Sequence, residues 1–338
     1  MGKYIVKRTL YMLLVLAVLS LLIFLAYNLL PVDKAADMAM QEILANKHLN
    51  YAERYLYWQR RYGLDGNLWT RYLRWIGLAP FYDGAFNGLL QGNLGTSITY
   101  GKPVAEIISK PLLNTAFLNL CSTVLAFAIT IPLGVFCARR RGSFRDGAVQ
   151  TGTLLGYSMP TFVIAILFIW LFAVKWNIFP VSGMSSVGKE YTGFRKVLDT
   201  LYHFALPIIV STFCSLGAMT RYVRASMLDA LHLDCIRTAR AKGLKESVIV
   251  RTHAFKNAVI PVLSIAIGWL VGIFAGSIMI ENIFGINGIG KVYFDALTAN
   301  DNEIALAMQI FYVLLALVGN LLTDIAYGLA DPRIRVGE

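Results

Sequence analysis

Charge is scarce in this sequence: 15% of the 338 residues are charged, whereas 57% are apolar. About a quarter of the residues of a soluble globular domain are charged, so the composition excludes that class and is typical of membrane proteins. Only four cysteines and four histidines are present. None has the close spacing of metal ligands, and the cysteines lie in apolar stretches or on the expected cytoplasmic side. Neither a metal site nor a disulfide is therefore predicted.

Six apolar stretches have about the length of 20 residues that a helix needs to cross a bilayer. They cover roughly 9–30, 112–137, 147–174, 203–220, 258–280 and 304–328. Charged residues are absent from all but the last, where Asp324 lies near one end. The first stretch is longer than the apolar core of a cleaved signal peptide, so we interpret it as a retained span. The sequence predicts an all-α membrane protein with six transmembrane helices.

Lysine and arginine gather in alternate loops. Seventeen of the 31 lie in residues 1–8, 138–146 and 221–257 or beyond residue 328. Because basic residues flank spans on the cytoplasmic side, both termini and the loop 221–257 are predicted to be cytoplasmic. The same tendency explains the net charge of +11 without a nucleic-acid partner.

The longest loop separates the first two spans. Residues 31–111 are rich in Tyr and Trp, and the periodicity of NYAERYLYWQRRYGL predicts short amphipathic helices there. The expected organisation is a cytoplasmic N-terminus and first transmembrane helix over 1–30, an external region over 31–111, and a five-helix core over 112–338. The core contains the cytoplasmic loop 221–257.

One segment has the glycine and lysine spacing of a phosphate-binding loop, GINGIGKV at 285–292. Val292 replaces the hydroxyl residue that would bind Mg²⁺, and a span rather than a strand precedes the segment. A glycine-rich turn is predicted instead. We expect no catalytic site and no cofactor in this chain.

No ionisable group lies near the centre of a span, where such groups mark ion-driven transport. Acidic residues on the predicted external side are expected to form a solvated rim rather than an acid/base set: Glu281, Asp295, Asp301 and Glu303. The energy for any transport therefore has to come from another source.

A short basic helix is predicted in the cytoplasmic loop. Asp234 is a candidate N-cap, Cys235 to Lys242 give about two turns, and Gly243 ends the helix. Ala239 and Ala241 keep part of its surface slim, and it has a single large apolar residue, so docking to another protein is favoured over binding to anionic lipid. The candidate docking residues are Arg237, Thr238, Ala239, Arg240, Ala241, Lys242, Gly243 and Leu244.

Three glycines recur every four residues in the fifth stretch: Gly268, Gly272 and Gly276. This spacing allows close helix approach, and packing within the subunit or against a partner subunit are both open.

Polar residues lie within two other spans. Thr115, Asn119 and Ser122 share one helical face, and Ser158 before Pro160 marks a kink. Two interpretations stay open for these polar groups: interhelical hydrogen bonds, or a weakly polar wall of a translocation path.

Several segments together resemble one family. They are GNLGTSITYGKPV (92–104), PLLNTAFL (111–118), SMPTFVIAILFIWLFAVKWNIFPVSG (158–183), YVRASMLDALHLDCIRTARAKGL (222–244), HAFKNAVIPV (253–262), FGINGIG (284–290) and DPRIR (331–335). In this order they resemble the permease subunits of ABC importers for dipeptides, oligopeptides or nickel. The resemblance covers nearly the whole chain.

The resemblance implies a type I ABC importer permease fold with an external elaboration after the first span, in a prokaryotic cytoplasmic membrane. It implies a second homologous permease, one or two cytoplasmic ATPase subunits that bind ATP and Mg²⁺, and an external substrate-binding lipoprotein. The 234–244 helix would dock into an ATPase groove. The implied substrates are di- or oligopeptides; nickel or another small solute is the alternative, and a gradient-driven transporter is less favoured.

Overall fold

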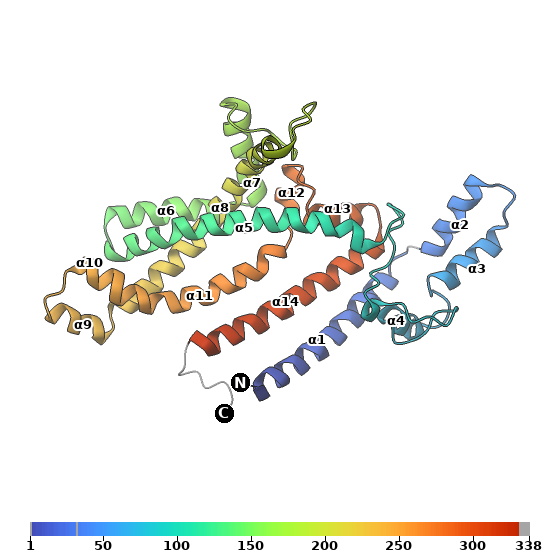
Figure 1. The fold of residues 1–338 in the computed structure, drawn as a ribbon, viewed down its shortest axis with the longest axis horizontal. Coiled ribbons are helices and arrows are strands. Elements are labelled where there is room, and N and C mark those ends of the chain that lie inside the picture. Colours follow the sequence, from blue (N-terminus) through green and yellow to red (C-terminus); the bar gives the residue numbers. More distant parts are fainter. Residues whose placement is uncertain (1, 32, 331–338) are drawn as a thin grey trace. The chain divides into compact units, whose positions relative to one another are not determined.

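The computed structural model describes residues 2–31 and 33–330, and most of them lie in helices (Figure 1). Within these ranges the only β-type pairing is an isolated bridge between Thr96 and Pro103. The closing DPRIR segment, at 331–335, lies outside the described residues. The fold is therefore all-α, as the composition predicts.

Contacts between residues divide the chain into two compact units. The first unit comprises Leu112–Lys291 and the chain from Leu315, with the start of the first helix. The second unit comprises Ile5–Pro111 and Val292–Leu314. The break at 111/112 coincides with the expected end of the external region. The first helix and residues 292–314 group with that region instead of with the core.

The second unit contains most of α1 (Gly2–Asn28), then α2 (Lys34–Ala45), α3 (Tyr51–Arg61), α4 (Leu68–Ile76), η1 (Leu89–Gln91), most of α13 (Ile289–Thr298) and the start of α14 (Asn302–Ala330). The first unit contains most of α5 (Val104–Arg139), then α6 (Phe144–Ser158), α7 (Thr161–Phe168), η2 (Ile169–Lys175), α8 (Gly193–Leu231), α9 (Asp234–Ala241), α10 (Glu246–Val248), η3 (Ile249–Ala254), α11 (Phe255–Val271), η4 (Gly272–Phe274) and α12 (Ile278–Ile283).

Five described helices are long and apolar enough to cross a membrane, and the bent pair Phe144–Ser158 and Thr161–Lys175 would make a sixth span. Its two halves meet at 103°, at the break that Ser158 and Pro160 predict. The sequence-based expectation for 258–280 is wrong at its end, because α11 stops at Val271. Apolar composition alone does not reveal this stop, since the residues that follow are also apolar.

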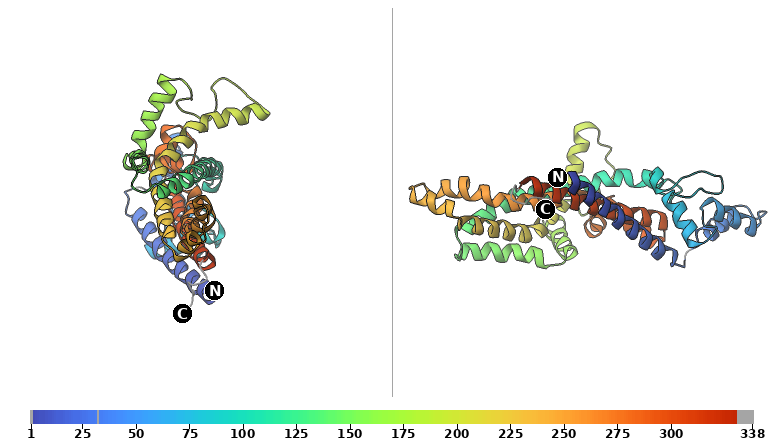
Figure 2. Two further views of the ribbon diagram at one scale, coloured as in Figure 1. Left: turned by 90° about the vertical axis from the view of Figure 1, so that its left-hand side faces the viewer. Right: turned by 90° about the horizontal axis from the view of Figure 1, so that it is seen from below.

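In the first unit, α8 lies between α6 and α11 and contacts both (Figures 1 and 2). One apolar cluster joins α8 to α9, η3 and α11, and a second joins α5, α7, α8 and α12. The Arg224 guanidinium on α8 also holds the buried Asp146 carboxylate on α6, with nitrogen–oxygen distances of 2.9 and 2.6 Å. The Arg224 side chain is 24% exposed, so solvent screens the pair in part, and the pair links the two helices.

The second unit is built on aromatic contacts. Phe24 of α1 packs against the rings of Tyr72 and Trp75 on α4, with centroid distances of 5.5 and 5.4 Å. The Tyr72 hydroxyl and Ser20 of α1 share a buried hydrogen bond of 2.9 Å. These contacts fix α4 along the end of α1.

A buried carboxylate organises the connection between α11 and the start of α13, which lies in the first unit. Glu281 is 0% exposed. Its Oε1 accepts hydrogen bonds from Thr115 Oγ1 (2.8 Å) and Ser277 N (3.2 Å), and its Oε2 accepts one from Lys291 N (2.9 Å). The Gly290 amide donates as well. Burial raises the pKa of Glu281, and these donors oppose the shift.

The glycine-rich turn predicted at 285–292 is present, and it wraps around this carboxylate. A Cβ on Gly288 would lie 2.4 Å from Glu281 Oε2, and one on Gly290 would lie 3.0 Å from it. These two glycines therefore let the backbone approach the acid closely enough to donate to it. The expected solvated rim is wrong for Glu281 and also for Asp301, which is 1% exposed. Each acid has donors far away in sequence, Thr115 for Glu281 and Ser97 and Thr99 for Asp301, which composition cannot show.

We expect Glu281→Gln to destabilise the folded chain. The amide nitrogen would face backbone N–H groups, and a buried donor left without an acceptor costs about 1–3 kcal/mol. Thermal unfolding of the purified protein in lipid nanodiscs measures the change. Thr115→Val removes one donor to the same carboxylate. The double variant should therefore lose less unfolding free energy than the two single variants lose together. Full additivity would show that the two side chains act independently.

Candidate functional site

The short basic helix predicted in the cytoplasmic loop is α9, Asp234–Ala241. Lys242 is its C-cap, and Gly243 follows in a left-handed conformation with φ of 74°. The expected capping role of Asp234 is wrong. Leu233 is the N-cap, and Asp234 is the first helical residue, whose carboxylate lies 3.5 Å from Arg237 instead. Sequence reasoning placed the cap one residue too late, because an extended Leu233 carries no capping signal.

One face of α9 packs against its own subunit. Ile236 and Ala239 are buried in the cluster that contains Ile249 and Val250 of η3. This corrects the expectation that Ala239 belongs to the free surface, because it faces inward at this helical spacing. Other candidate docking residues are exposed: Arg237, Thr238, Arg240, Ala241, Lys242, Gly243 and Leu244. The outward face of α9 is thus basic and has one large apolar residue at its end.

An ion pair braces the turn after α9. Arg240 donates to both oxygens of Glu246, with the shorter distance 2.8 Å. Both side chains are about half exposed, so the pair contributes only about 0–1 kcal/mol to stability. The pair links the last turn of α9 to Glu246, the first residue of α10.

The polar face predicted on α5 makes hydrogen bonds to other parts of the first unit. Thr115 donates to Glu281, and Asn119 Nδ2 donates to the carbonyls of Ile273 (3.0 Å) and Ala275 (2.8 Å). Ser122 donates to the carbonyl of Leu118 in its own helix. Of the two interpretations left open by the sequence, the structure contains the interhelical bonds for Thr115 and Asn119. Ser158 is exposed at the end of α6.

The three glycines of the fifth stretch do not share one helical face. Gly268 lies in α11, Gly272 opens η4, and Gly276 lies beyond it, just before α12. A Cβ on Gly276 would lie 2.4 Å from the Gly290 amide nitrogen, so this glycine permits a close backbone approach within the subunit. No atom lies within 4 Å of a Cβ built on Gly268 or Gly272. Those two positions are open on the described chain.

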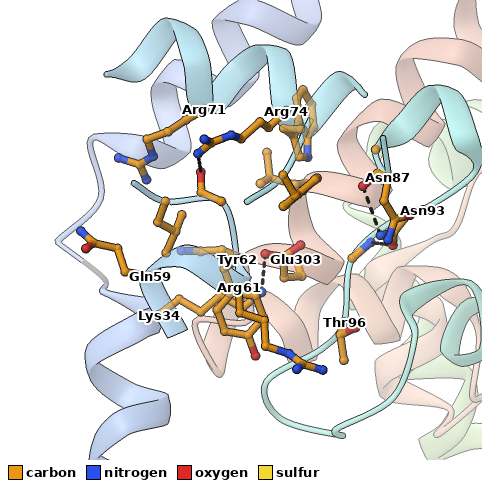
Figure 3. Close-up of a pocket in the computed structure, with 18 of the residues that line it drawn as sticks. Lys34, Gln59, Arg61, Tyr62, Arg71, Arg74, Asn87, Asn93, Thr96 and Glu303 are labelled. Atoms are coloured by element: carbon orange, nitrogen blue, oxygen red, sulfur yellow. Dashed lines mark hydrogen bonds and ion pairs between the residues drawn. The ribbon is translucent and has the colours of Figure 1, made fainter. Parts of the chain in front are cut away.

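The second unit contains a cavity of about 640 Å³ that sequence reasoning missed. It is lined by the end of α1, by α3 and α4, by the loop 81–96 and by the start of α14 (Figure 3). Lys34 and Glu303 form an ion pair of 2.5 Å on its wall, and the Lys34 ammonium also lies 3.8 Å from the centre of the Tyr62 ring. Burial and the nearby Glu303 raise the pKa of Tyr62 to about 12.

The sequence offered a partial signal for this cavity. The amphipathic periodicity around NYAERYLYWQRRYGL does predict α3, but it cannot predict that Lys34 of α2 pairs with Glu303 of α14. Among residues 2–31 and 33–330, no group of three or more His, Cys, Asp or Glu side chains is placed to hold a metal ion.

The chain is similar to two bacterial peptide-transport permease proteins and to one solved structure. Oligopeptide transport system permease protein AppB of Bacillus subtilis (strain 168) is 34% identical over 335 residues, 99% of each chain. Dipeptide transport system permease protein DppB of Escherichia coli (strain K12) is 34% identical over 335 residues, 94% of each chain. A solved structure, described as inward facing conformations of the MetNI methionine ABC transporter, is 17% identical with a TM-score of 0.47, over 65% of this chain and 96% of that one.

Residues 130–336 match a protein-family model described as the binding-protein-dependent transport system inner membrane component. The matched range begins within α5 and contains α9 and the glycine-rich turn around Glu281. Such a component is a transport permease and not itself a catalyst. The chain belongs to the family of inner membrane components of binding-protein-dependent transport systems.

Proposed function

We propose that this chain is a permease subunit of an ATP-driven, binding-protein-dependent importer of di- or oligopeptides. The observation that carries the proposal is the similarity, over nearly the full length, to permease proteins named for oligopeptide and dipeptide transport. The nickel alternative has no comparable support among these names. The chain supplies one half of a translocation pathway, and a second homologous permease supplies the other.

The other partners follow from the same proposal. One or two cytoplasmic ATPase subunits bind ATP and Mg²⁺, and an external lipoprotein delivers the substrate. The clustering of basic residues in alternate loops supports cytoplasmic termini and a cytoplasmic α9. The exposed basic face of α9 supports docking to an ATPase, because its inward face already packs on the subunit and fixes the helix in place.

Reconstitution in liposomes tests the energy source. The assembled importer, with its binding protein and ATP, should accumulate a labelled tripeptide, whereas the purified chain alone should neither hydrolyse ATP nor accumulate the peptide. Ion-driven transport uses ionisable groups within membrane spans. The buried acid Glu281 lies outside the candidate spans, and its oxygens already accept hydrogen bonds, which supports this expectation. Gradient-driven uptake by the lone chain would contradict the proposal.

Cysteine cross-linking tests the docking of α9. Cys235 is exposed on the same helix, so it is first replaced by Ser. A cysteine at the exposed Ala241 should then cross-link to an ATPase subunit in the assembled complex. A cysteine at the buried Ala239 is the matched control and should not react. Equal labelling of both positions, or labelling of Ala241→Cys by lipid reagents only, would show that α9 does not dock.

Gly272→Leu tests whether the partner permease packs on α11 and η4. Since a Cβ at Gly272 meets no atom of this chain within 4 Å, the variant should fold with an unchanged melting temperature. If the partner approaches here, the added side chain should reduce recovery of the permease pair in native mass spectrometry. Gly276→Leu is the contrasting variant, because it clashes within the subunit and should lower the melting temperature itself. An intact pair with Gly272→Leu would place the partner elsewhere.

A further inference from the structure

The cavity of the second unit has four cationic side chains on its lining: Lys34, Arg61, Arg71 and Arg74. Lys34 is paired with Glu303 on the same wall. Its charge is therefore largely balanced before any ligand arrives.

Arg74 is also engaged. Its Nη1 donates to the Asp65 carboxylate at 2.8 Å and to the Asp65 carbonyl at 2.9 Å, and its Nε donates to the carbonyl of Pro80 at 3.1 Å. Arg74 therefore holds the loop that follows α3 and the loop that follows α4. It is a structural residue of the cavity wall.

Arg61 has a different set of partners. Its Nη1 donates to the Tyr57 hydroxyl at 2.8 Å, and its guanidinium lies over the rings of Tyr57 and Trp58. Figure 3 shows Arg61 and Arg71 on separate parts of the lining. Stacking and a hydrogen bond thus occupy Arg61 within α3.

Arg71 differs from the other three. No ion pair is recorded for it within the described chain, and its Nε is buried without a hydrogen-bond partner. Burial lowers the pKa of Arg71, while the charge of Asp33 opposes this shift. Asp33 itself accepts hydrogen bonds from the α2 amides of Ala35 and Ala36 and from the Tyr55 hydroxyl. A buried guanidinium donor without an acceptor costs free energy, and an incoming anion would recover it.

Among the described residues, two acidic groups on the lining form no ion pair: Asp33, whose charge acts on Arg71, and Asp83. Asp83 accepts a hydrogen bond of 3.0 Å from the Ala85 amide, and no ion pair is recorded for it in the part of the chain that the structure describes. Aromatic side chains of Tyr62, Trp75 and Phe81 cover other parts of the lining. Arg71, the exposed Asp83 and the aromatic side chains together complement a small zwitterion with apolar side chains.

We propose that this cavity binds a short zwitterionic peptide, with the C-terminal carboxylate on Arg71 and the amino terminus directed to Asp83. A guanidinium holds a carboxylate through two parallel hydrogen bonds, and the Nε of Arg71 is a donor without a partner in the described chain. A volume of about 640 Å³ falls within the usual range for small-molecule sites. The proposal rests on the proposed function and adds to it a binding site on the permease itself.

The experiment measures the binding of trialanine to the permease–ATPase complex in phosphatidylcholine nanodiscs, without binding protein, by isothermal titration. Trialanine should bind, and its C-terminal amide should bind about tenfold more weakly because it brings no charge to Arg71. N-acetyl-trialanine should lose affinity through Asp83 in the same way. Equal affinities for trialanine and its amide, or no binding of trialanine, would overturn the proposal without any variant.

Variants locate the site. Arg71→Gln should weaken trialanine binding about tenfold and abolish the preference over the amide, while Arg71→Lys should retain part of the preference. Arg60→Gln is the matched control, since Arg60 lies on α3 but not on the cavity lining, and it should change neither affinity. A preference that survives in Arg71→Gln would overturn the assignment, and melting temperatures show whether each variant is folded.

Two further measurements distinguish failure of this inference from failure of the proposed function. Nanodiscs with phosphatidylglycerol test whether a lipid phosphate takes the place of the peptide carboxylate; loss of trialanine binding there would assign the cavity to lipid and overturn the proposal. Uptake of trialanine by the complete importer tests the proposed function. If uptake is normal and cavity binding is absent, only the inference fails, whereas an importer that takes up no peptide overturns the proposed function as well.

Discussion

The buried carboxylate of Glu281 constrains the first unit more than any other single group. An ionised carboxylate loses its hydration on burial, so it persists only where the protein supplies hydrogen-bond donors. Here α5 supplies Thr115, and the backbone around α12 supplies Ser277, Gly290 and Lys291. Because these donors come from separate segments, the acid fixes the register of all of them at once. The glycine-rich turn meets this requirement, because it brings the Gly290 and Lys291 amides to the acid.

The sequence predicted the membrane spans well but did not predict the burial of Glu281, and one physical reason explains both results. Apolar length and charge depletion are local properties, so they locate five spanning helices and even the bend at Ser158 and Pro160. Burial of Glu281 depends on Thr115, which is 166 positions away. An acid at the end of an apolar run is usually solvated, and only the glycines at 288 and 290 signal that the backbone approaches it.

The α9 helix shows which features of a candidate site the local sequence can predict and which it cannot. Its length and its stop at Gly243 follow from helix propensity and left-handed glycine, and both agree with the sequence. Which alanine faces outward does not follow, because that depends on η3. Ile249 and Val250 receive Ile236 and Ala239, and Ala241 is left on the free face. The packing of η3 on one face of α9 therefore decides which residues of α9 remain available for docking on the other face.

The cavity of the second unit arises from long-range pairing by the first turn of α14. Asp301 accepts hydrogen bonds from Ser97 and from the Thr99 amide, so it anchors the loop that carries Gly95. Glu303, two residues later, pairs with Lys34, and a Cβ on Gly95 would lie 2.0 Å from its Oε2. A side chain at position 95 would collide with the Glu303 carboxylate, so glycine is the residue that fits there. Asp301 is thus engaged by the loop and Glu303 by Lys34, so neither acid pairs with the arginines on the lining. Among these arginines, Arg71 is the one with a buried donor that has no partner in the described chain.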